Sequence, residues 1–386
     1  MRSVYIHIPF CKSICSYCDF CKFLYKEEWA EAYLNALKDE IYEYYEGDTI
    51  KSIYIGGGTP SSLSLEDIKY LFRIIEVFKG ANDEEITFEC NVNDINNELL
   101  SLLKECGVNR LSIGIESFDK VNLKFLNRKH EKKEIFDNIK LAKKYFDNIN
   151  VDLIYALPTE TMSIFKKDVK NILKLDVNHI STYSLIIEDH TILYNKKVEN
   201  ISEDDDYKMY KYICKKLAKK GYNHYEVSNF AKEGYESKHN LTYWYNEEYY
   251  GFGLGSHGYV NKIRYENTRN FHKYLKGEYK LNELLVSTLE EMENEIILGL
   301  RKLKGINIYE FKKKFDTDIF EAFPKIKNVI NMKKGLLEYI IEDDKHIYVR
   351  IPEDKIYIMN EIINMILWVF KGFLMNSFFI WQWIYK

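Results

Sequence analysis

The sequence predicts an α/β fold: a partial barrel of six strand–helix units followed by a small winged-helix-like domain. Three observations support this prediction. Strand-like runs alternate with helical patterns through the first 230 residues, a group of cysteines directly follows the first strand-like run, and the pattern changes after about residue 285. Alternation of this kind is typical of right-handed βαβ units, which form a parallel sheet covered by helices.

Six runs rich in β-branched and aromatic residues are the predicted strands. They are residues 3–8, 52–57, 86–92, 110–115, 150–157 and 180–187. Helical segments lie between them, and the first of these, residues 27–45, carries apolar residues at helical spacing. Because the functional groups of parallel α/β folds gather at the carboxyl ends of the strands, the residues that follow these runs are candidates for a functional site.

The chain is predicted to divide into four parts. Residues 1–230 form the barrel, 231–285 a connecting region rich in tyrosine, phenylalanine and glycine, 286–367 the winged-helix-like domain, and 368–386 an apolar tail. In the third part a helix is expected over 288–303. Two alternating runs within 336–351 flank an acidic turn, and this pattern predicts a hairpin.

The composition narrows the class of protein. The chain has 386 residues, of which 46% are hydrophobic and 30% charged, as expected for a globular protein of two or three domains. Its net charge of -4 predicts no basic surface of the kind that nucleic-acid-binding proteins carry. His7 and Pro9 interrupt any apolar stretch near the N-terminus, so we predict no signal peptide and expect a cytoplasmic protein with reduced thiols.

The C-terminal stretch 362–384 contains one charged residue, Lys371, and three of the five tryptophans. Three arrangements fit it: a final core helix with an apolar tail packed on the protein, a helix lying at a membrane surface, or a membrane span. A lysine at the centre of a span costs about 2.5 to 3.5 kcal/mol on insertion scales, which disfavours the span. Contact of the tail with a membrane surface is therefore one of the expectations, and the three arrangements stay open.

Three of the seven cysteines, Cys11, Cys15 and Cys18, form a C-x3-C-x2-C motif just after the first predicted strand. Three thiolates on one short loop can hold three irons of a [4Fe–4S] cluster and leave the fourth iron open, whereas clusters that only carry electrons usually have four cysteines. Zinc usually has closed tetrahedral coordination, commonly from two separated ligand pairs, but here a second C-x2-C pair, Cys18 and Cys21, overlaps the first. The motif favours an iron–sulfur cluster, with zinc and unliganded thiols as alternatives.

A glycine-rich segment ends the second predicted strand, where Gly57, Gly58 and Thr59 lie in the sequence "GGGTP". Glycine allows the backbone to approach a ligand closely and exposes amide donors, or it simply makes a tight turn. Both interpretations fit the sequence.

Acidic residues lie on the next three predicted strands, at or near their carboxyl ends: Glu89, Glu116 and Asp152. Each of them by itself is equally well a surface or ion-pair residue. Because the carboxyl ends of neighbouring parallel strands meet at one edge of the sheet, we expect the three to face one cavity, where they could bind ribose hydroxyls or an amino group.

Several motifs together resemble those of the radical S-adenosylmethionine enzymes. More narrowly, they are similar to the group that holds the oxygen-independent coproporphyrinogen III oxidases and the HemW-type haem chaperones. The motifs are YIHIPFC, GGGTPSSL, LNRKH, DLIYALPTET, YEVSNFA, HNLTYW and GFGLGSHG, and the resemblance runs from about residue 4 to about residue 366. It implies a partial (β/α)6 radical S-adenosylmethionine barrel in which Cys11, Cys15 and Cys18 ligate a [4Fe–4S] cluster. The open iron of that cluster would take the amino and carboxylate groups of S-adenosylmethionine.

The resemblance also implies a set of residues that contact S-adenosylmethionine: Tyr5, Gly57, Gly58, Thr59, Glu89, Glu116, Arg128 and Asp152. Glu116 departs from the family pattern, which has glutamine at this position. A carboxylate can accept from a hydroxyl or an amine but cannot donate an amide hydrogen bond, so this one contact is in doubt.

Two features favour the chaperone branch of the group. The oxidases carry a fourth cysteine two residues beyond the third and a long N-terminal extension, whereas here Phe20 takes that position, Cys21 follows it, and only ten residues precede Cys11. The sequence "HNLTYW" resembles the HNxxYW motif of the chaperones, which implies that His239 contacts haem, whose iron commonly takes an axial histidine. The resemblance therefore implies a protein that binds haem and transfers it to haem-accepting apoproteins.

Two other functions stay open. The first is a coproporphyrinogen III dehydrogenase, which removes two propionate carboxyl groups by radical hydrogen abstraction. The second is a radical methyltransferase with another substrate. Whether the chain is an enzyme at all is thus undecided by its sequence. The segment "GFGLGSHG" either places His257 near the haem or forms a tight glycine-rich turn.

Overall fold

The computed structural model describes residues 1–332 and 334–367, and these residues form two compact units. The barrel unit comprises residues 1–223, 230–239 and 248–284, and the described part of the C-terminal unit comprises residues 224–229, 240–247, 285–332 and 334–367. The predicted tail, 368–386, and its contact with a membrane surface lie outside the described residues. In the described part of the chain, no helix has both the length and the apolar character needed to cross a membrane.

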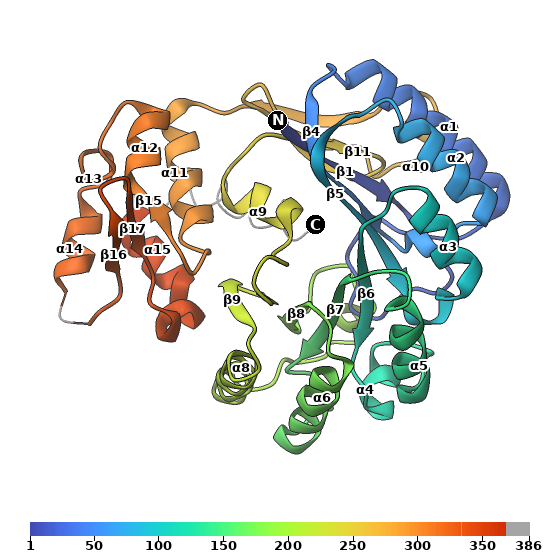
Figure 1. Cartoon of the computed structure of the whole chain (residues 1–386), viewed down its shortest axis with the longest axis horizontal. Helices are drawn as coiled ribbons and strands as arrows, with labels where there is room; N and C mark the ends of the chain where they lie inside the picture. The colour runs from blue at the N-terminus through green and yellow to red at the C-terminus, as the bar shows by residue number, and fades with distance from the viewer. Residues whose placement is uncertain (333, 368–386) are drawn as a thin grey trace. The chain divides into compact units, whose positions relative to one another are not determined.

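The barrel unit is built on a parallel sheet with helices on its outer side (Figure 1). Its six predicted strands are all present, as β1 (Arg2–Ile8), β4 (Thr49–Gly57), β5 (Lys79–Asn91), β6 (Arg110–Glu116), β7 (Asn148–Tyr155) and β8 (His179–Ser184). They pair in this order, and every pairing is parallel. The main connecting helices are α1 (Glu27–Tyr44), α2 (Leu65–Ile75), α3 (Asn97–Glu105), α4 (Lys120–Phe125), α5 (Lys132–Ala142) and α6 (Met162–Leu175). The α/β fold predicted from the alternating pattern is confirmed.

Helix boundaries follow local sequence signals. In α1, Tyr33, Leu34 and Leu37 form a buried stripe at helical spacing that packs in the core. The helix α2 begins after a capping box in which Ser64 and Asp67 satisfy each other's backbone N–H groups. Such caps fix where each helix begins and therefore where the loop at the end of the preceding strand lies.

The strands of the barrel alternate between an outer apolar face and an inner polar face. On β1, Val4 and Ile6 belong to the core, whereas Ser3, Tyr5 and His7 lie opposite Ser52, Tyr54 and Gly56 of β4. Parallel strands that are covered on both sides by helices usually have sequences that are continuously apolar. The period-two alternation here instead gives the barrel a polar interior, and this interior is where the functional side chains lie.

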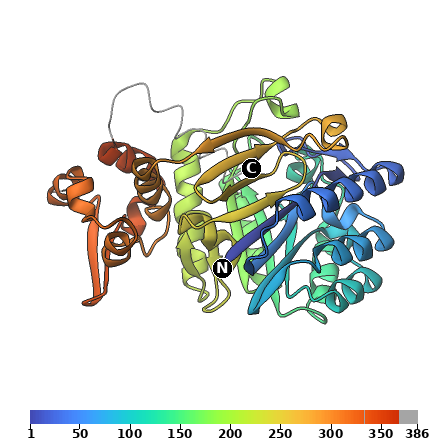
Figure 2. The same cartoon turned by 90° about the horizontal axis from the view of Figure 1, so that it is seen from above.

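Residues 249–285, predicted only as part of a connecting region, form four further strands of this sheet. They are β11 (Tyr249–Phe252), β12 (His257–Val260), β13 (Ile263–Asn267) and β14 (Lys280–Leu285). The first of them pairs in parallel with β1, and the next two continue the sheet antiparallel (Figure 2). These strands are short and are separated by glycine-rich turns, so their periodicity is too weak to detect in the sequence. The pairing of β11 with β1 also depends on contacts about 245 residues apart in the sequence.

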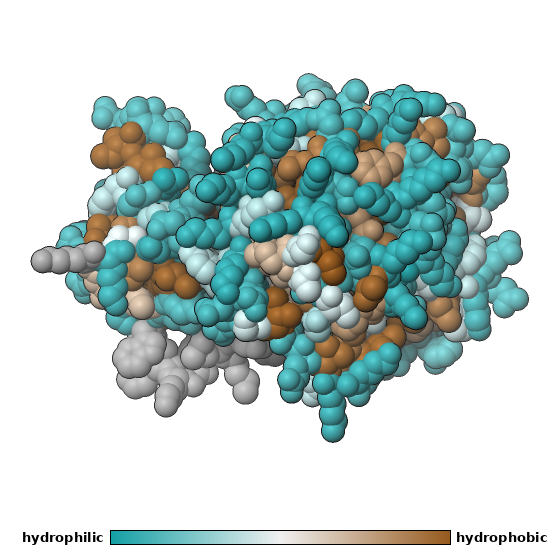
Figure 3. All heavy atoms as spheres, turned by 90° about the horizontal axis from the view of Figure 1, so that it is seen from below, coloured by the Kyte–Doolittle hydropathy of each residue, from teal (hydrophilic) through white to brown (hydrophobic). Residues whose placement is uncertain are grey.

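The C-terminal unit contains a three-stranded antiparallel sheet with helices, as predicted for a winged-helix-like domain. The sheet has the order β15 (Ile306–Asn307), β17 (His346–Arg350) and β16 (Glu338–Asp343), and the last two strands form the expected hairpin. Its helices are α11 (Thr288–Gly299), α12 (Ile308–Phe315), α13 (Ile319–Ala322), α14 (Lys325–Asn331) and α15 (Met359–Leu367). The face of the protein drawn in Figure 3 is mostly hydrophilic, with hydrophobic residues in scattered groups.

Candidate functional site

The predicted cluster ligands lie in the loop that follows β1, at the carboxyl end of the barrel strands. The Thr59 hydroxyl lies 3.5 Å from the Cys11 sulfur, and the Arg128 guanidinium lies 3.5 Å from the Cys15 sulfur. Burial is the largest cause that raises the pKa of the Cys11 thiol to about 11 and that of the Cys18 thiol to about 12, and the neighbouring Cys15 contributes to both values. The three thiols are therefore close together, and those of Cys11 and Cys18 would remain protonated at neutral pH without a metal group to stabilise the thiolates.

The fourth cysteine of this segment, Cys21, faces another part of the barrel unit. Its sulfur lies 4.0 Å from the carbonyl oxygen of Arg269, and its Cβ is the nearest atom to the position that a side chain at Gly255 would occupy. The residue is 8% exposed and belongs to the hydrophobic core. Cys21 thus packs as a small apolar side chain.

The donor set fits an iron–sulfur cluster better than a zinc ion. Within residues 1–332 and 334–367, no three His, Cys, Asp or Glu side chains converge closely enough to ligate one metal ion. Structural zinc needs four ligands around a single ion, whereas the three thiolates of an open [4Fe–4S] cluster bind three different irons and lie farther apart. Three neighbouring thiols on one loop, without a fourth ligand, match the second arrangement.

The amides of the glycine-rich segment after β4 are bonded within the protein. Gly57 N–H donates to Glu89 Oε2 at 3.1 Å, Gly58 N–H to Ile8 O at 2.9 Å, and Thr59 N–H to Phe10 O at 2.8 Å. The expectation that these amides are exposed donors for a ligand is therefore wrong. The groups of this segment that could still contact a ligand are its carbonyl groups, its Cα atoms and the Thr59 hydroxyl.

The glycines themselves are needed for close packing. A Cβ at Gly57, where φ is 110°, would lie 2.5 Å from the His7 ring, and a Cβ at Gly58 would lie 2.8 Å from the backbone of Pro9. Both distances are shorter than real carbon contacts allow. The segment is thus a tight turn that holds the cysteine loop against the end of β4, as the simpler interpretation of the sequence proposed.

The three predicted acids lie on the inner face of β5, β6 and β7. Glu89 Oε1 accepts from the Tyr54 hydroxyl at 2.7 Å, and Asp152 Oδ1 accepts from the Asn150 amide at 2.8 Å. Burial is the main cause that raises the pKa of Glu89 to about 7, and the charge of Asp152 raises it as well. Burial also raises the pKa of Asp152. The acids therefore share one interior, as their position near the strand ends predicts.

Glu116 has a positively charged partner in this interior. Its Oε1 accepts from Arg128 at 2.7 Å and from the Tyr17 hydroxyl at 3.0 Å, and both side chains of the ion pair are about 10% exposed or less. Arg128 also donates to Asn91 Oδ1 and to Gly114 O, each at 2.7 Å. Glu116, which stands where the family pattern has glutamine, thus accepts hydrogen bonds from donors of the protein itself.

The charges of this interior suit a cationic ligand. Glu89, Glu116 and Asp152 carry three negative charges when ionised, and Arg128 supplies one positive charge beside them. Burial and the charge of Asp152 raise the pKa of Glu116 to about 7 even with Arg128 at 2.7 Å. A ligand with sulfonium and ammonium groups, such as S-adenosylmethionine, would favour ionisation of the acids and so fits the site.

His239, the predicted haem contact, lies inside the barrel unit on α9 (Lys238–Trp244). Its Nδ1 is 3.0 Å from the Ser52 hydroxyl, and its backbone N–H donates to Glu85 Oε1 at 3.1 Å. The residue is 1% exposed, and burial lowers the pKa of the imidazole to about 3, so it is neutral. A neutral imidazole is the form that binds iron, but this one is enclosed by protein.

The imidazole and the cysteine loop lie toward opposite ends of the barrel strands. Ser52 precedes Gly57 on β4 by five residues, or about 16 Å of strand. Tyr54 lies between these ends, because its ring centroid is 5.2 Å from that of His239 while its hydroxyl bonds Glu89. Tyr5, also predicted as a ligand contact, is beside it, with its hydroxyl 3.0 Å from His7 Nδ1.

Sequence reasoning missed Tyr17 and Tyr54 as members of the site. Tyr54 alternates with Gly56 on the inner face of β4, so the period-two pattern could have identified it. Tyr17 lies between two cysteines and follows no such pattern. The structure places His257 on β12, after a turn in which Gly253 and Gly255 have φ of 101° and 69°, consistent with the tight glycine-rich turn.

Comparisons with known proteins agree with this architecture. The family model described as the radical SAM superfamily matches residues 5–172, and that of the HemN C-terminal domain matches residues 286–349. The chain resembles the solved structure of coproporphyrinogen III oxidase (HemN) from Escherichia coli with a TM-score of 0.81, covering 95% of this chain and 90% of that one. The two are 21% identical, so this likeness shows the fold.

Curated relatives are more similar in sequence. The heme chaperone HemW of Lactococcus lactis subsp. lactis is 43% identical over 342 residues, which cover 86% of this chain and 90% of the relative. The heme chaperone HemW of Bacillus subtilis is 39% identical over 352 residues, covering 87% and 93%. Likeness of this degree over nearly the full length of both chains shows common membership: the chain belongs to the HemW family of the radical SAM superfamily.

Proposed function

We propose that this protein is a haem chaperone that binds haem, holds a [4Fe–4S] cluster together with S-adenosylmethionine, and transfers haem to acceptor apoproteins. The observation that carries the proposal is the set of seven curated relatives at 30 to 43% identity, each named heme chaperone HemW and matched over 72 to 88% of this chain. The similarity to coproporphyrinogen III oxidase concerns the fold, and we propose no second function from it.

Each part of the site has a role in this proposal. Cys11, Cys15 and Cys18 hold the cluster, and the interior acids with Arg128 hold S-adenosylmethionine. Gly57, Gly58 and Thr59 line the same end of the barrel, and Tyr5 lies beside Tyr54, between that end and His239. When bound, the cluster and S-adenosylmethionine supply a one-electron route to cleavage of the sulfonium. The chain's own residues orient the ligand: Arg128 fixes Glu116, and Tyr54 fixes Glu89.

Haem transfer is tested directly on the anaerobically reconstituted protein. We expect haem to produce a Soret band, and the band to move to apomyoglobin, used as a generic acceptor, when the two proteins are mixed. In a parallel assay the protein receives coproporphyrinogen III, S-adenosylmethionine and a reductant. Formation of protoporphyrinogen at a catalytic rate would contradict the chaperone proposal and favour the dehydrogenase.

The role of His239 is tested by His239→Ala. If the imidazole ligates haem iron, this variant should bind haem more weakly and shift the Soret band, because the iron loses a nitrogen donor. Cluster content should stay unchanged, since the cysteine loop lies about 16 Å away along β4. An imidazole that is 1% exposed reaches a porphyrin only if α9 moves, so haem ligation would also make α9 more susceptible to proteolysis.

Two control variants distinguish ligation from a structural role. Ser52→Ala removes the hydrogen-bond partner of Nδ1 but keeps the imidazole. A structural histidine would make His239→Ala and Ser52→Ala lower the melting temperature alike and leave the Soret band of the bound haem in place. His257→Ala should change the spectrum less than His239→Ala. An unchanged spectrum and affinity in His239→Ala would remove His239 from the proposed haem site.

Binding of S-adenosylmethionine should depend on pH through Glu89. The pKa of this acid is raised to about 7, mainly by burial, and a cationic ligand favours its ionised form. We therefore expect the affinity to rise from about pH 6 to about pH 8, by at most about tenfold per pH unit for one group, with protons released on binding. Calorimetry in buffers of different ionisation enthalpy measures the proton release. Glu89→Gln should reduce the dependence and leave the part that comes from Glu116, whose pKa is also raised to about 7. Proton uptake by the wild type would contradict the assignment.

A further inference from the structure

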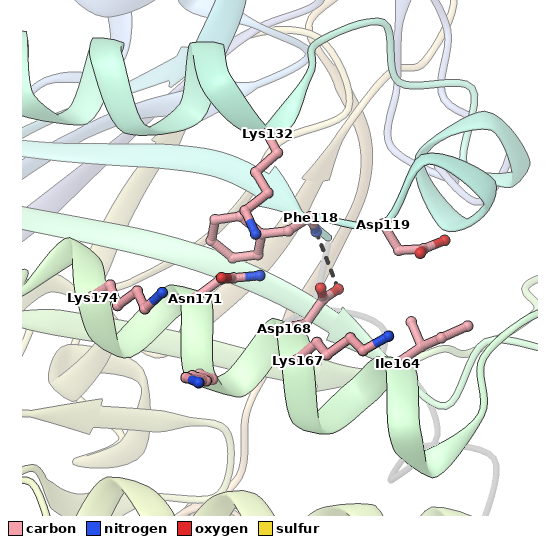
Figure 4. A pocket seen from close by; sticks show the side chains of 9 residues that line it. Phe118, Asp119, Lys132, Ile164, Lys167, Asp168, Asn171 and Lys174 are labelled. Atoms are coloured by element: carbon pink, nitrogen blue, oxygen red, sulfur yellow. Dashed lines mark hydrogen bonds between the residues drawn. The ribbon is translucent and has the colours of Figure 1, made fainter.

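A second polar pocket lies on the outer side of the barrel unit, between α5 and α6 (Figure 4). We call it the α5–α6 pocket. Its volume is about 350 Å³, and it is lined by Phe118, Asp119, Lys132, Ile164, Lys167, Asp168, Lys170, Asn171 and Lys174. These residues lie on the helices and on the loop after β6, whereas the acids of the functional site point into the barrel. The pocket is therefore a separate feature.

In the described part of the chain, none of its four lysines forms a close ion pair, although the charge of Lys132 acts on the Asp168 carboxyl group. Lys132 begins α5, and Lys167, Lys170 and Lys174 repeat along one face of α6. Within residues 1–332 and 334–367, none of the four forms an ion pair or a side-chain hydrogen bond, and all four are exposed. Several like charges held around one hollow repel one another unless an anion lies between them.

The carboxylates of the lining are already bonded to protein donors. Asp119 caps α4 by accepting from the backbone N–H groups of Val121 and Asn122. Asp168, which is 2% exposed, accepts from the Ser117 hydroxyl and the Phe118 N–H (Figure 4). With both acids ionised, the lining still has two more positive than negative charges.

Asn171 supplies a second and independent indication of a ligand. It is 7% exposed, it lines the pocket, and its side-chain amide makes no hydrogen bond to another described residue. Figure 4 shows its amide between the side chains of Lys174 and Asp168, below the ammonium group of Lys132. The Asn171 amide atoms are not among the fully buried unpartnered atoms of the described residues, so they are open to the pocket and available to bond a ligand or water in it.

We propose that the α5–α6 pocket binds a small multivalent anion that carries phosphate groups. Lys132 of α5 and three lysines of α6 line one pocket together with the Asn171 amide, and lysine binds phosphate as a compact point charge. The volume lies at the lower end of the range for small-molecule sites, which favours a small ligand over a protein segment. Such an anion would bridge α5 and α6 and so stabilise the barrel unit.

Inorganic pyrophosphate is the probe that tests the site, by calorimetry on the full chain with its cluster reconstituted. At about 150 mM salt, where exposed charges are screened beyond about 8 Å, we expect one pyrophosphate per chain and a raised melting temperature. The triple variant Lys167→Gln, Lys170→Gln, Lys174→Gln should weaken binding by roughly tenfold or more. Asn171→Leu, which keeps the volume of the side chain, should weaken it as well.

The matched control is Lys215→Gln, Lys219→Gln, Lys220→Gln, at the end of α8 (Glu203–Ala218), which changes the net charge equally. It should bind pyrophosphate as the wild type does. No binding to the wild type, or equal loss in both triple variants, would overturn the proposal. So would binding of a polyglutamate peptide in the absence of pyrophosphate binding, because that result would identify a protein-docking surface. Circular dichroism of each variant verifies that it is folded.

Discussion

Replacing any one of Cys11, Cys15 or Cys18 by alanine should abolish the iron–sulfur cluster, whereas Cys21→Ala should leave it intact. The first three thiols lie together beyond the end of β1, where Cys11 is buried and Cys18 is half-buried. Desolvation raises the pKa of both thiols in spite of the nearby Lys22 ammonium group. Three thiolates suffice if the fourth iron is to remain open for S-adenosylmethionine. The Cys21 sulfur points instead to the carbonyl of Arg269, 4.0 Å away.

Iron and acid-labile sulfide per chain, measured after anaerobic reconstitution, check this expectation. Cys90→Ala is a second control, since Cys90 is a buried core cysteine, 4% exposed, outside the loop. Both control variants should retain full iron and sulfide and lose only the packing of a small apolar side chain. Complete loss of the cluster in Cys21→Ala would mean a closed four-cysteine cluster without an open iron.

Arg128→Met should destabilise the protein by about 3 to 5 kcal/mol, because it leaves the Glu116 carboxylate buried without its cationic partner. The two side chains are 10% and 8% exposed and are joined at 2.7 Å, so little water is available to replace the guanidinium. The same variant should lose S-adenosylmethionine binding, because the interior would lack the group that holds Glu116 and Asn91 in place. Urea unfolding and calorimetry measure the two effects separately.

The double variant Arg128→Met, Glu116→Gln separates stability from binding. It contains no unpaired carboxylate at this position, so part of the lost stability should return, and the amide side chain then matches the family pattern. S-adenosylmethionine binding should stay lost if Arg128 itself positions the ligand site. Recovery of binding in the double variant would show that Arg128 serves only to balance the charge of Glu116. Glu116→Gln alone should keep most of the stability, because an amide oxygen can still accept from Tyr17 and Arg128.

The sequence by itself determined the strands, the motif of the cluster and the family. The six strands of the barrel are visible because each is a compact run of β-branched and aromatic residues between helical patterns. The cysteine motif is visible because ligands on one short loop are neighbours in the chain. These features are local, so periodicity and spacing report them directly.

Only the tertiary structure decided which polar groups meet. The Gly57 amide is bonded to Glu89, 32 residues away, and Cys21 packs against Arg269, 248 residues away. The strand β5 begins at Lys79, earlier than its apolar run predicts, because Lys79 and Gly80 pair with β4. His239 is enclosed beside Ser52 rather than presented at a surface. Each outcome follows from packing between segments that are distant in the sequence. A buried donor or acceptor must form a hydrogen bond with a group that the fold places beside it, and a local sequence pattern does not show which group that is.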